Sequence, residues 1–392
     1  MGTNIFKAAL TLEADPQVAI EAIAHQIKTM LGSRACHLAI LFVSEGYPEY
    51  RSDSLLQQFR SIVQPEHLIG CNTSGVIGSD HEIEMKPAIS VLAMHLPEVK
   101  LFPFWLPPEQ IEQFNSGEDV IDCLDVYPTD HPKFICLGDP LTTDVRRFLN
   151  MFNNAYRQLP VVGGLASANA SGIPNWLVLD ESLYESGLVG MVMVGDITFE
   201  TVVSQGCRPI GEPYIITKSE KNILHELAGK PPLQVLRELF VSLPAHDQAL
   251  MQHALFVGLA MDENRQQLKR GDFLIRNILG ADETSGAMSI GEMLDTGQTL
   301  QFQLRDKDAS EDDLKTLLGN MKNELSDASG ALLVSCLGRG AGLFGEPDHD
   351  IQMIQALRGP LPVAGFFANG EFGPVNAKNY VHGYTSSLTI FR

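Results

Sequence analysis

The sequence lacks the cysteine and histidine spacings of disulfide-rich or metal-binding proteins. Its six cysteines are scattered through 392 residues without a Cys-x-x-Cys pair, which favours reduced thiols over a disulfide framework or a zinc site. The eleven histidines show no His-Glu-x-x-His or other ligand spacing. We therefore expect no bound metal and no cofactor.

Long apolar runs and export signals are missing as well. Residues 1–6 contain neither a basic n-region nor an apolar h-region, so no secretory signal is predicted. Near-apolar stretches such as residues 187–195 are far shorter than the ~20 residues that span a bilayer, and they are typical of buried strands. We expect a cytoplasmic protein without membrane insertion.

Basic charge is scarce, with 28 Lys and Arg against 48 Asp and Glu and a formal net charge of −20. A strongly acidic protein repels phosphate backbones, which argues against nucleic acid as a partner. No Gly-x-Ser-x-Gly or Walker motif is present, so the sequence gives no positive indication of an enzyme.

What the sequence does contain is a globular composition, with 44% hydrophobic residues, and a repeated order of elements. The length favours two domains or an internally repeated unit. Apolar periodicity predicts the order helix, strand, helix, strand, glycine-rich loop and further strands. In the first copy these are residues 16–31, 37–43, 55–63, 68–71, 72–78 and 88–96.

The same order returns twice. The second copy has helices at 117–126 and 144–156, strands at 133–137, 176–179, 188–194 and 198–204, and a glycine loop at 162–169. The third has helices at 311–325 and 350–357, strands at 331–336 and 385–391, and a glycine loop at 362–371. Such alternation predicts a mixed α/β fold with internal repeats, in which helices flank mixed sheets in two packed halves.

A change in amino-acid composition separates the two halves. Glycine and proline recur between residues 206 and 232, between short apolar stretches. This composition is typical of a domain boundary. We place the boundary between residues 225 and 226, which gives an N-terminal domain of residues 1–225 and a C-terminal domain of residues 226–392.

Several short motifs in a fixed order resemble the FIST family. They include residues 68–78 (LIGCNTSGVIG), 205–213 (QGCRPIGEP), 335–340 (SCLGRG), 364–371 (AGFFANGE) and 382–385 (HGYT). The first half is similar to FIST_N and the second half to FIST_C. The resemblance implies a sensory module that binds a small ligand, an amino acid or small carboxylate, and that passes its signal to an unidentified signalling protein.

The glycine loops supply the first group of candidate ligand-binding residues. Strand ends that open into glycine turns leave backbone N–H groups able to approach an anion. The alternative is that these glycines only allow positive φ in hairpins. The candidates are Gly70, Cys71, Ser74, Gly75, Gly163, Gly164, Ser167, Gly365 and Asn369.

Charged residues supply the second group. Arg339, beside Gly338, follows an apolar strand and has the planar fork that grips a carboxylate. Glu371 is a candidate acceptor for an ammonium group, or alternatively a partner of its own turn or of Arg339. Arg276 is a further candidate anion binder. Arg305 is either another one or the ion-pair partner of the adjacent Asp306.

The thiols leave a third interpretation open. Cys336 and Cys71 both lie at predicted strand ends, where nearby donors lower a thiol pKa. His382 is the candidate base for Cys336 in a thiol-dependent enzyme, whereas inert buried cysteine is the alternative. The sequence therefore predicts a ligand sensor first, with a protein-binding adaptor and a thiol enzyme as the other interpretations.

Overall fold

The computed structural model describes residues 3–47, 53–265, 267–321 and 326–392. It confirms the predicted mixed α+β class. The contacts divide the chain into two compact units. Unit 1 contains residues 1–203, 315–381 and 385–392, and unit 2 contains residues 204–314 and 382–384. This division follows packing, whereas the boundary between residues 225 and 226 was drawn from the sequence and stays a prediction.

Unit 1 is built from three parallel strand pairs, and a helix joins the two strands of each pair. The first sheet has β2 (Leu38–Ser44), α2 (Asp53–Val63) and β3 (His67–Thr73). The second has β8 (Lys133–Gly138), α5 (Val145–Ala155) and β9 (Val161–Leu165). The third has β21 (Gly330–Cys336), α11 (His349–Arg358) and β22 (Val363–Ala368). The internal repeats predicted from the sequence are thus confirmed.

Each parallel pair continues into antiparallel strands on one side. β6 (Ile89–His95), β12 (Leu188–Gly195) and β25 (Thr385–Phe391) pair with the first strand of their sheets. The outermost strands are β1 (Ile5–Thr11), β7 (Val99–Leu106) and β13 (Phe199–Gln205). Every sheet of unit 1 therefore combines one parallel pair with antiparallel neighbours.

On the other side, each sheet is completed by a hairpin from a different repeat. β3 leads into β4 (Gly75–Ile77) and β5 (Glu82–Glu84), and β4 pairs with β22. β9 is followed by β10 (Leu177–Leu179) and β11 (Ser182–Tyr184), and β10 pairs with β3. β22 is followed by β23 (Glu371–Val375) and β24 (Lys378–His382), and β23 pairs with β9. Because the exchange is cyclic, no repeat completes its sheet alone.

Two of the predicted glycine loops begin as strands. Gly163 and Gly164 lie inside β9, and Gly365 lies inside β22. The glycines at these positions were interpreted as turn residues, but the parallel ladders extend through them. The loops begin only at Ala166 and Asn369.

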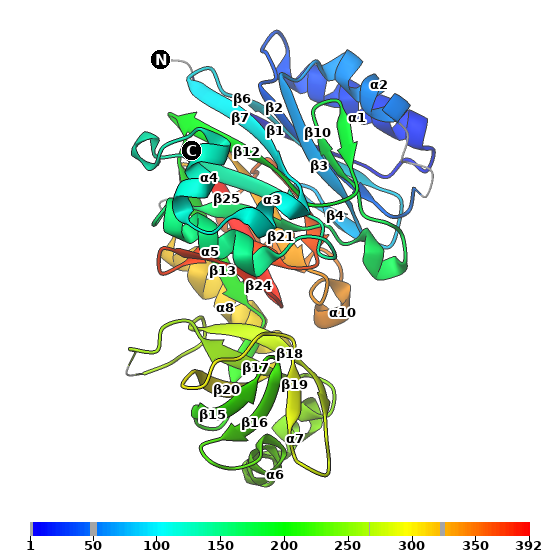
Figure 1. Ribbon diagram of the computed structural model, residues 1–392. Coiled ribbons are helices and arrows are strands. Elements are labelled where there is room, and N and C mark those ends of the chain that lie inside the picture. The colour runs from blue at the N-terminus through cyan, green and yellow to red at the C-terminus, as the bar shows by residue number, and fades with distance from the viewer. Residues whose placement is uncertain (1–2, 48–52, 266, 322–325) are drawn as a thin grey trace. The chain divides into compact units, whose positions relative to one another are not determined.

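The core of unit 1 lies on both faces of its sheets. Phe42, Ile135 and Val334, one from each parallel pair, belong to a single buried cluster between the sheets. On the outer face of the first sheet, α1 (Pro16–Leu31) and α2 cover the strands (Figure 1). Asp15 caps α1 by accepting hydrogen bonds from two backbone N–H groups of its first turn, as N-cap residues do. Burial on two faces explains why β2 is apolar at nearly every position.

The remaining helices of unit 1 are short. α3 (Pro108–Gln113) and α4 (Gly117–Leu124) precede β8, and α10 (Ala341–Phe344) follows β21. The helix predicted at 311–325 is α8 (Lys307–Asn320), and residues 322–325 lie outside the described residues. In the part of the chain that is described, no helix is long and apolar enough to cross a membrane.

Unit 2 is a small antiparallel barrel. Its strands are β14 (Cys207–Pro209), β15 (Tyr214–Glu220), β16 (Ile223–Leu227), β17 (Leu255–Ala260), β18 (Phe273–Ala281), β19 (Met288–Ile290) and β20 (Thr299–Arg305). β17 pairs with both β18 and β20, which closes the sheet. α6 (Pro232–Ser242) and α7 (Ala245–Met251) pack against it. The glycine- and proline-rich segment at 206–232 thus forms strands of this barrel.

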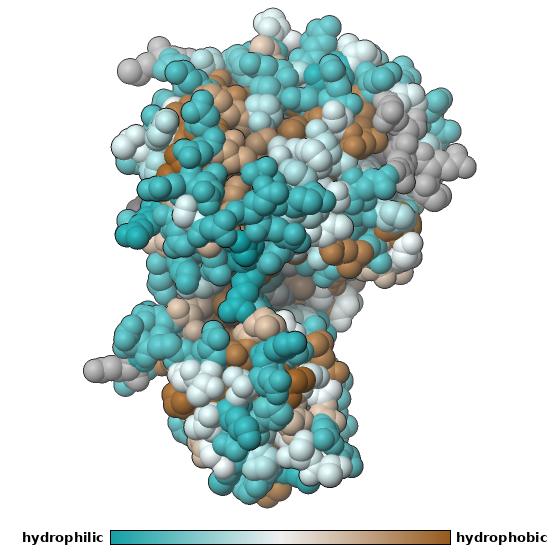
Figure 2. Space-filling view, in the orientation of Figure 1, coloured by the Kyte–Doolittle hydropathy of each residue, from teal (hydrophilic) through white to brown (hydrophobic). Residues whose placement is uncertain are grey.

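The visible surface is mainly polar. The face shown in Figure 2 is mostly hydrophilic, and its apolar residues form several separate groups between polar ones. Scattered apolar residues of this kind are normal for a globular protein and do not by themselves indicate a binding site.

Candidate functional site

Three of the candidate glycines occupy equivalent places in the repeats. Gly70, Gly163 and Gly365 each lie opposite a residue of the preceding parallel strand. A Cβ atom at any of them would come within 3.0 Å of the carbonyl oxygen of that residue, namely Leu41, Cys136 or Leu333. Close approach of two backbones is one of the uses of glycine. The packing alone therefore accounts for these three residues.

A network of hydroxyl groups joins the ends of β3, β9 and β22. The Thr73 and Ser167 hydroxyl oxygens are 2.9 Å apart, and both hydroxyls donate to the Phe367 carbonyl oxygen. The Ser167 Oγ also accepts a hydrogen bond from the Ser74 N–H at 3.0 Å. Each repeat contributes to this network, so the predicted Ser74 and Ser167 are brought together. Because their polar atoms already bind one another, the network serves to hold the repeats together.

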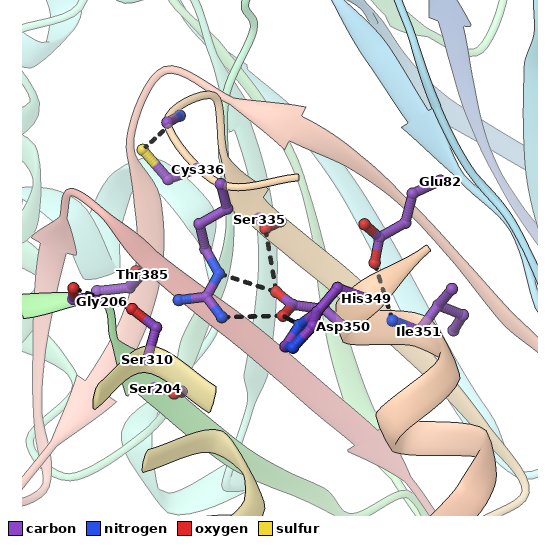
Figure 3. Close-up of polar contacts among 12 residues, drawn as sticks. Glu82, Ser204, Gly206, Ser310, Ser335, Cys336, His349, Asp350, Ile351 and Thr385 are labelled. Atoms are coloured by element: carbon purple, nitrogen blue, oxygen red, sulfur yellow. Dashed lines mark hydrogen bonds and ion pairs between the residues drawn. The ribbon is translucent and has the colours of Figure 1, made fainter. Parts of the chain in front are cut away.

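The strand ends of the third repeat hold a buried ion pair (Figure 3). Arg339 Nε and Nη2 donate to the two carboxylate oxygens of Asp350, at 2.8 and 2.9 Å. His349 Nδ1 lies 3.0 Å from Asp350 Oδ1, and the Arg339 guanidinium lies over the Phe344 ring. Arg339 and Asp350 are both 1% exposed. The bidentate grip expected of Arg339 is thus directed at a residue of the protein itself.

Burial and charge shift the titration of this cluster. Burial would raise the pKa of Asp350, but the charge of Arg339 outweighs it and holds that pKa well below its usual range. Glu82, on the exchanged hairpin, accepts a hydrogen bond from the Ile351 N–H at 2.8 Å. Its own burial, followed by the negative charge of Asp350, raises the pKa of Glu82 to about 8. The cluster therefore combines an ionised pair with a neutral acid near pH 7.

Glu371 lies beside this cluster at the start of β23. It is 0% exposed, and its Oε2 accepts hydrogen bonds from the Thr385 hydroxyl at 2.6 Å and the Thr385 N–H at 3.3 Å. Burial raises the pKa of Glu371 to about 8, although Thr385, Arg339 and Cys336 all act to lower it. Arg339, Cys336 and Glu371, three residues predicted as site residues, are thus close enough to interact.

Two polar atoms of this group have no hydrogen-bond partner among the described residues, namely Arg339 Nη1 and Glu371 Oε1. We call them the open atoms. Buried polar groups are hydrogen-bonded in the great majority of cases, and each exception needs an explanation. One open atom is a cationic donor and the other belongs to a carboxyl group, so together they match the two ends of a zwitterion.

The two candidate cysteines differ. Cys71 is fully buried inside β3, and burial raises its pKa, which agrees with the alternative of an inert buried cysteine. Cys336 ends β21, and its sulfur accepts the Gly338 N–H at 3.5 Å. Only Cys336, with Gly338, belongs to the charged cluster of the third repeat.

Other predicted residues lie elsewhere. Gly75 starts β4, Gly164 lies in β9 beside β23, and Asn369 is exposed in the loop after β22. Arg276 and His382 belong to unit 2, where Arg276 Nε donates to Glu292 at 2.9 Å. The proposed use of His382 as a base for Cys336 stays a prediction.

The expected pairing of neighbouring Arg305 and Asp306 takes a different form. Asp306 accepts a hydrogen bond from Arg208 at 2.7 Å, and the Arg305 guanidinium lies over the Tyr384 ring. Arg208 also pairs with Asp247. The charged side chains at this strand end therefore stabilise the barrel of unit 2.

Sequence reasoning missed four residues of the cluster, namely Glu82, Asp350, Thr385 and Ser386. Ser386 lies opposite Ser335, and its buried Oγ also lacks a hydrogen-bond partner within the described parts of the chain. A signal existed for Asp350, since it was placed at the start of a predicted helix next to the third strand pair. No local signal indicates that Glu82 reaches this place, because it arrives on the exchanged hairpin.

The comparisons with known proteins cover nearly the whole chain. Over 376 residues it is 37% identical to Uncharacterized protein Rv0628c from Mycobacterium tuberculosis, which covers 96% of each chain. It is 35% identical over 379 residues to Uncharacterized protein Mb0898c from Mycobacterium bovis, which covers 96% of this chain and 95% of that protein. Residues 37–230 match the FIST N domain, and residues 232–374 match the FIST C domain. The chain therefore belongs to the FIST family, whose domains are associated with sensory roles in signal transduction.

Proposed function

We propose that this protein is a sensory module that binds a small ligand with a carboxylate, such as an amino acid, at the strand ends of the third repeat. The observation that carries the proposal is the pair of open atoms. They belong to Arg339 and Glu371, which are 1% and 0% exposed. Family membership supports a sensory role, and the site supports the class of ligand.

The energetics favour a ligand at this place. A buried polar group without a partner destabilises a protein by about 1–3 kcal/mol. A ligand carboxylate that accepts from Arg339 Nη1 and an ammonium group that donates to Glu371 Oε1 would remove both costs. Because Asp350 occupies Nε and Nη2 of Arg339, the ligand carboxylate forms a single bond to the guanidinium. Asp350 in turn fixes the orientation of that guanidinium.

Because the proposed site is buried, binding of a ligand requires a change of conformation. Arg339 and Glu371 are closed off from solvent, so a ligand enters only when the elements around them move. β4 and β5 carry Glu82 and Glu84, which bind the backbone N–H groups of Ile351 and Ala341. A ligand that favours an opened arrangement of these elements shifts the population towards it. Such a shift is the signal that a separate signalling protein in the cytoplasm would read.

Thermal-shift measurements on the purified protein test the proposal. The panel contains the twenty common L-amino acids together with acetate, propionate, succinate and glutarate. A compound present at 100 times its dissociation constant stabilises the protein by about 2.7 kcal/mol. We expect at least one amino acid to raise the melting temperature. If no compound does so while a stable protein partner is captured, the adaptor function replaces the sensor.

The variant Glu371→Gln assigns the site. Glutamine keeps the shape and can accept from Thr385, but it offers an ammonium group no charge. Glu238→Gln is the control, because Glu238 is exposed and lies in unit 2, outside the proposed site. Loss of the amino-acid response in Glu371→Gln but not in Glu238→Gln supports the proposed site. Equal responses in both variants place the ligand elsewhere.

A further inference from the structure

We infer that binding at this site ionises Glu371 and releases its proton to solvent, so that the ligand supplies a cationic group to Glu371 Oε1. The inference rests on the proposed function, since it concerns the same site. It adds that the contact between the ligand's ammonium group and Glu371 changes the protonation of Glu371, so that the affinity depends on pH through this one carboxyl.

The geometry around Glu371 supports a neutral carboxyl before a ligand binds. Glu371 is completely buried, and its Oε2 takes both hydrogen bonds from Thr385. Oε1 is one of the open atoms. A buried carboxylate is unfavourable when one of its charged oxygens has no hydrogen-bond donor. The protonated carboxyl carries no net charge, so its burial costs less free energy.

The charged groups that face Glu371 do not change this outcome. Arg339 is the cation that acts on it, from the end of β21, and Cys336 contacts it from the same strand. Arg339 uses two of its nitrogens on Asp350, which carries the opposite charge. Thr385, on β25, contributes uncharged donors. Burial therefore prevails, and the pKa of Glu371 rises to about 8.

An ammonium group at Oε1 reverses the balance. It donates a charge-assisted hydrogen bond to the carboxylate, and an opposite charge at this distance lowers a carboxyl pKa. Near pH 7 the ligand arrives as R–NH₃⁺ and meets the acid Glu371–COOH. The product is the pair Glu371–COO⁻ and R–NH₃⁺, and one proton leaves to buffer. No covalent bond forms other than that between the proton and its new acceptor.

A ligand without an ammonium group gives the opposite sign. A carboxylate bound to Arg339 Nη1 adds a negative charge beside Glu371, and a like charge raises a carboxyl pKa. Such a ligand keeps the proton on Glu371 or adds one from solvent. The sign of proton exchange thus distinguishes an amino acid from a plain carboxylate at this site.

Isothermal titration calorimetry measures this exchange directly. The probes are the panel amino acid with the largest thermal shift and its deaminated acid, for example L-alanine with propionate. Each is titrated at pH 6.5 in two buffers that differ in ionisation enthalpy, and the difference in heat gives the number of protons exchanged. We expect close to one proton released for the amino acid. Its dissociation constant should fall about tenfold per pH unit between pH 6 and pH 7, and level off above pH 8.

The variants separate Glu371 from other titrating groups. Glu371→Gln should abolish the release and flatten the pH dependence, whereas Glu238→Gln, at an exposed carboxylate of unit 2, should retain both. Infrared difference spectra give a second readout, because the carbonyl band of a protonated carboxyl should disappear on binding in the wild type and be absent in Glu371→Gln.

The outcomes that overturn the inference are distinct from those that overturn the proposed function. Binding of the amino acid with no proton exchange, or with proton uptake, contradicts the inference and leaves the sensor function standing. Release that persists undiminished in Glu371→Gln also contradicts it. Absence of binding by every compound of the panel overturns the proposed function, and the inference with it.

Discussion

In the second and third repeats, a buried charged residue follows the first strand of the parallel pair, but the two residues find their hydrogen-bond partners in different ways. At the end of β8, Asp139 is buried, and its Oδ2 accepts hydrogen bonds from the Thr142 N–H at 2.9 Å and the Thr142 hydroxyl at 2.7 Å. Its Oδ1 accepts from Asn175 at 2.8 Å. Most of these partners lie within three residues, so the charge is satisfied by its own turn.

The charged residues near the end of β21 instead have partners that are more distant in the sequence. Arg339 pairs with Asp350, eleven residues further on, and Glu371 is held by Thr385 of β25. Arg339 Nη1 and Glu371 Oε1 lack hydrogen-bond partners among the described residues. The comparison shows that the end of such a strand can carry either a charge whose hydrogen bonds are made mainly within its own turn, or a charged cluster in which some polar atoms have no protein partner. The residues that follow the strand decide between them.

The largest expected effect comes from breaking the buried ion pair. Arg339→Met leaves Asp350 buried without its partner, which should lower the free energy of unfolding by about 3–5 kcal/mol. Asp139→Asn in the second repeat, where the turn supplies neutral donors, should cost about 1 kcal/mol. Denaturant unfolding measures both. The double variant Arg339→Met with Asp350→Leu should recover much of the loss, and a loss below that of Asp139→Asn would remove the distinction between the repeats.

The second prediction uses pH. Because the pKa of Glu371 is raised to about 8, the folded protein keeps a proton that the unfolded chain releases above its ordinary pKa. Stability should therefore fall as pH rises from about 5 to 8, by at most about 1.4 kcal/mol per pH unit for this group. Glu371→Gln should reduce the fall, while Glu82, whose pKa is also raised to about 8, accounts for a further part of it. Melting temperatures at pH 5 and pH 8 test it, with exposed Glu238→Gln as the control, and an unchanged slope would contradict the buried neutral acid.

A third prediction tests whether the repeats are equivalent at their glycines. Gly365→Ala places a Cβ against the Leu333 carbonyl oxygen, and such overpacking should cost about 1–3 kcal/mol or more. Gly163→Ala should cost at least as much, since φ at Gly163 is also +117°. At Gly342 no described atom lies within 4 Å of the added Cβ, so Gly342→Ala should be nearly neutral in thermal unfolding. Similar stability for all three variants would disprove the close approach of the strands.

The smallest expected effect concerns the hydroxyl network between the repeats. Ser167→Ala removes the partner of Thr73 and of the Ser74 N–H, which should lower the free energy of unfolding by about 1–2 kcal/mol. Ser61→Ala, at an exposed hydroxyl that binds within its own helix, is the control. Denaturant midpoints compare the two. If both variants match the wild type, the network does not hold the three strand ends together.

Local pattern was sufficient to place most of the secondary structure. The apolar periodicity at residues 16–31 predicted α1 with its bounds as observed, and the apolar run at 385–391 predicted β25 likewise. The strand at 331–336 and the helix at 350–357 were predicted as part of a mixed α/β fold, and the register shows that β21 and β22 on either side of this helix are parallel neighbours. These predictions succeed because period and crossover handedness depend on short stretches of chain.

The candidate site was predictable only in part. The strand-end position and the chemistry of Arg339 and Glu371 follow from the sequence, because residues after a buried strand reach the edge of its sheet. Their partners do not follow. Asp350 competes successfully for the fork of Arg339, and Glu82 arrives on a hairpin that begins after β3.

The sequence by itself determined the elements, the repeat and the family, since each is written in local periodicity and in the order of short motifs. Packing across long separations determined the cyclic exchange of hairpins, the pairing of Arg339 with Asp350, and the burial of Glu371 between β9 and β25. The physical reason is that the pKa of an ionisable group depends on its burial and on the charges and donors that lie near it in space. For Glu371 that surrounding comes from strands of two different sheets, which no stretch of neighbouring residues encodes.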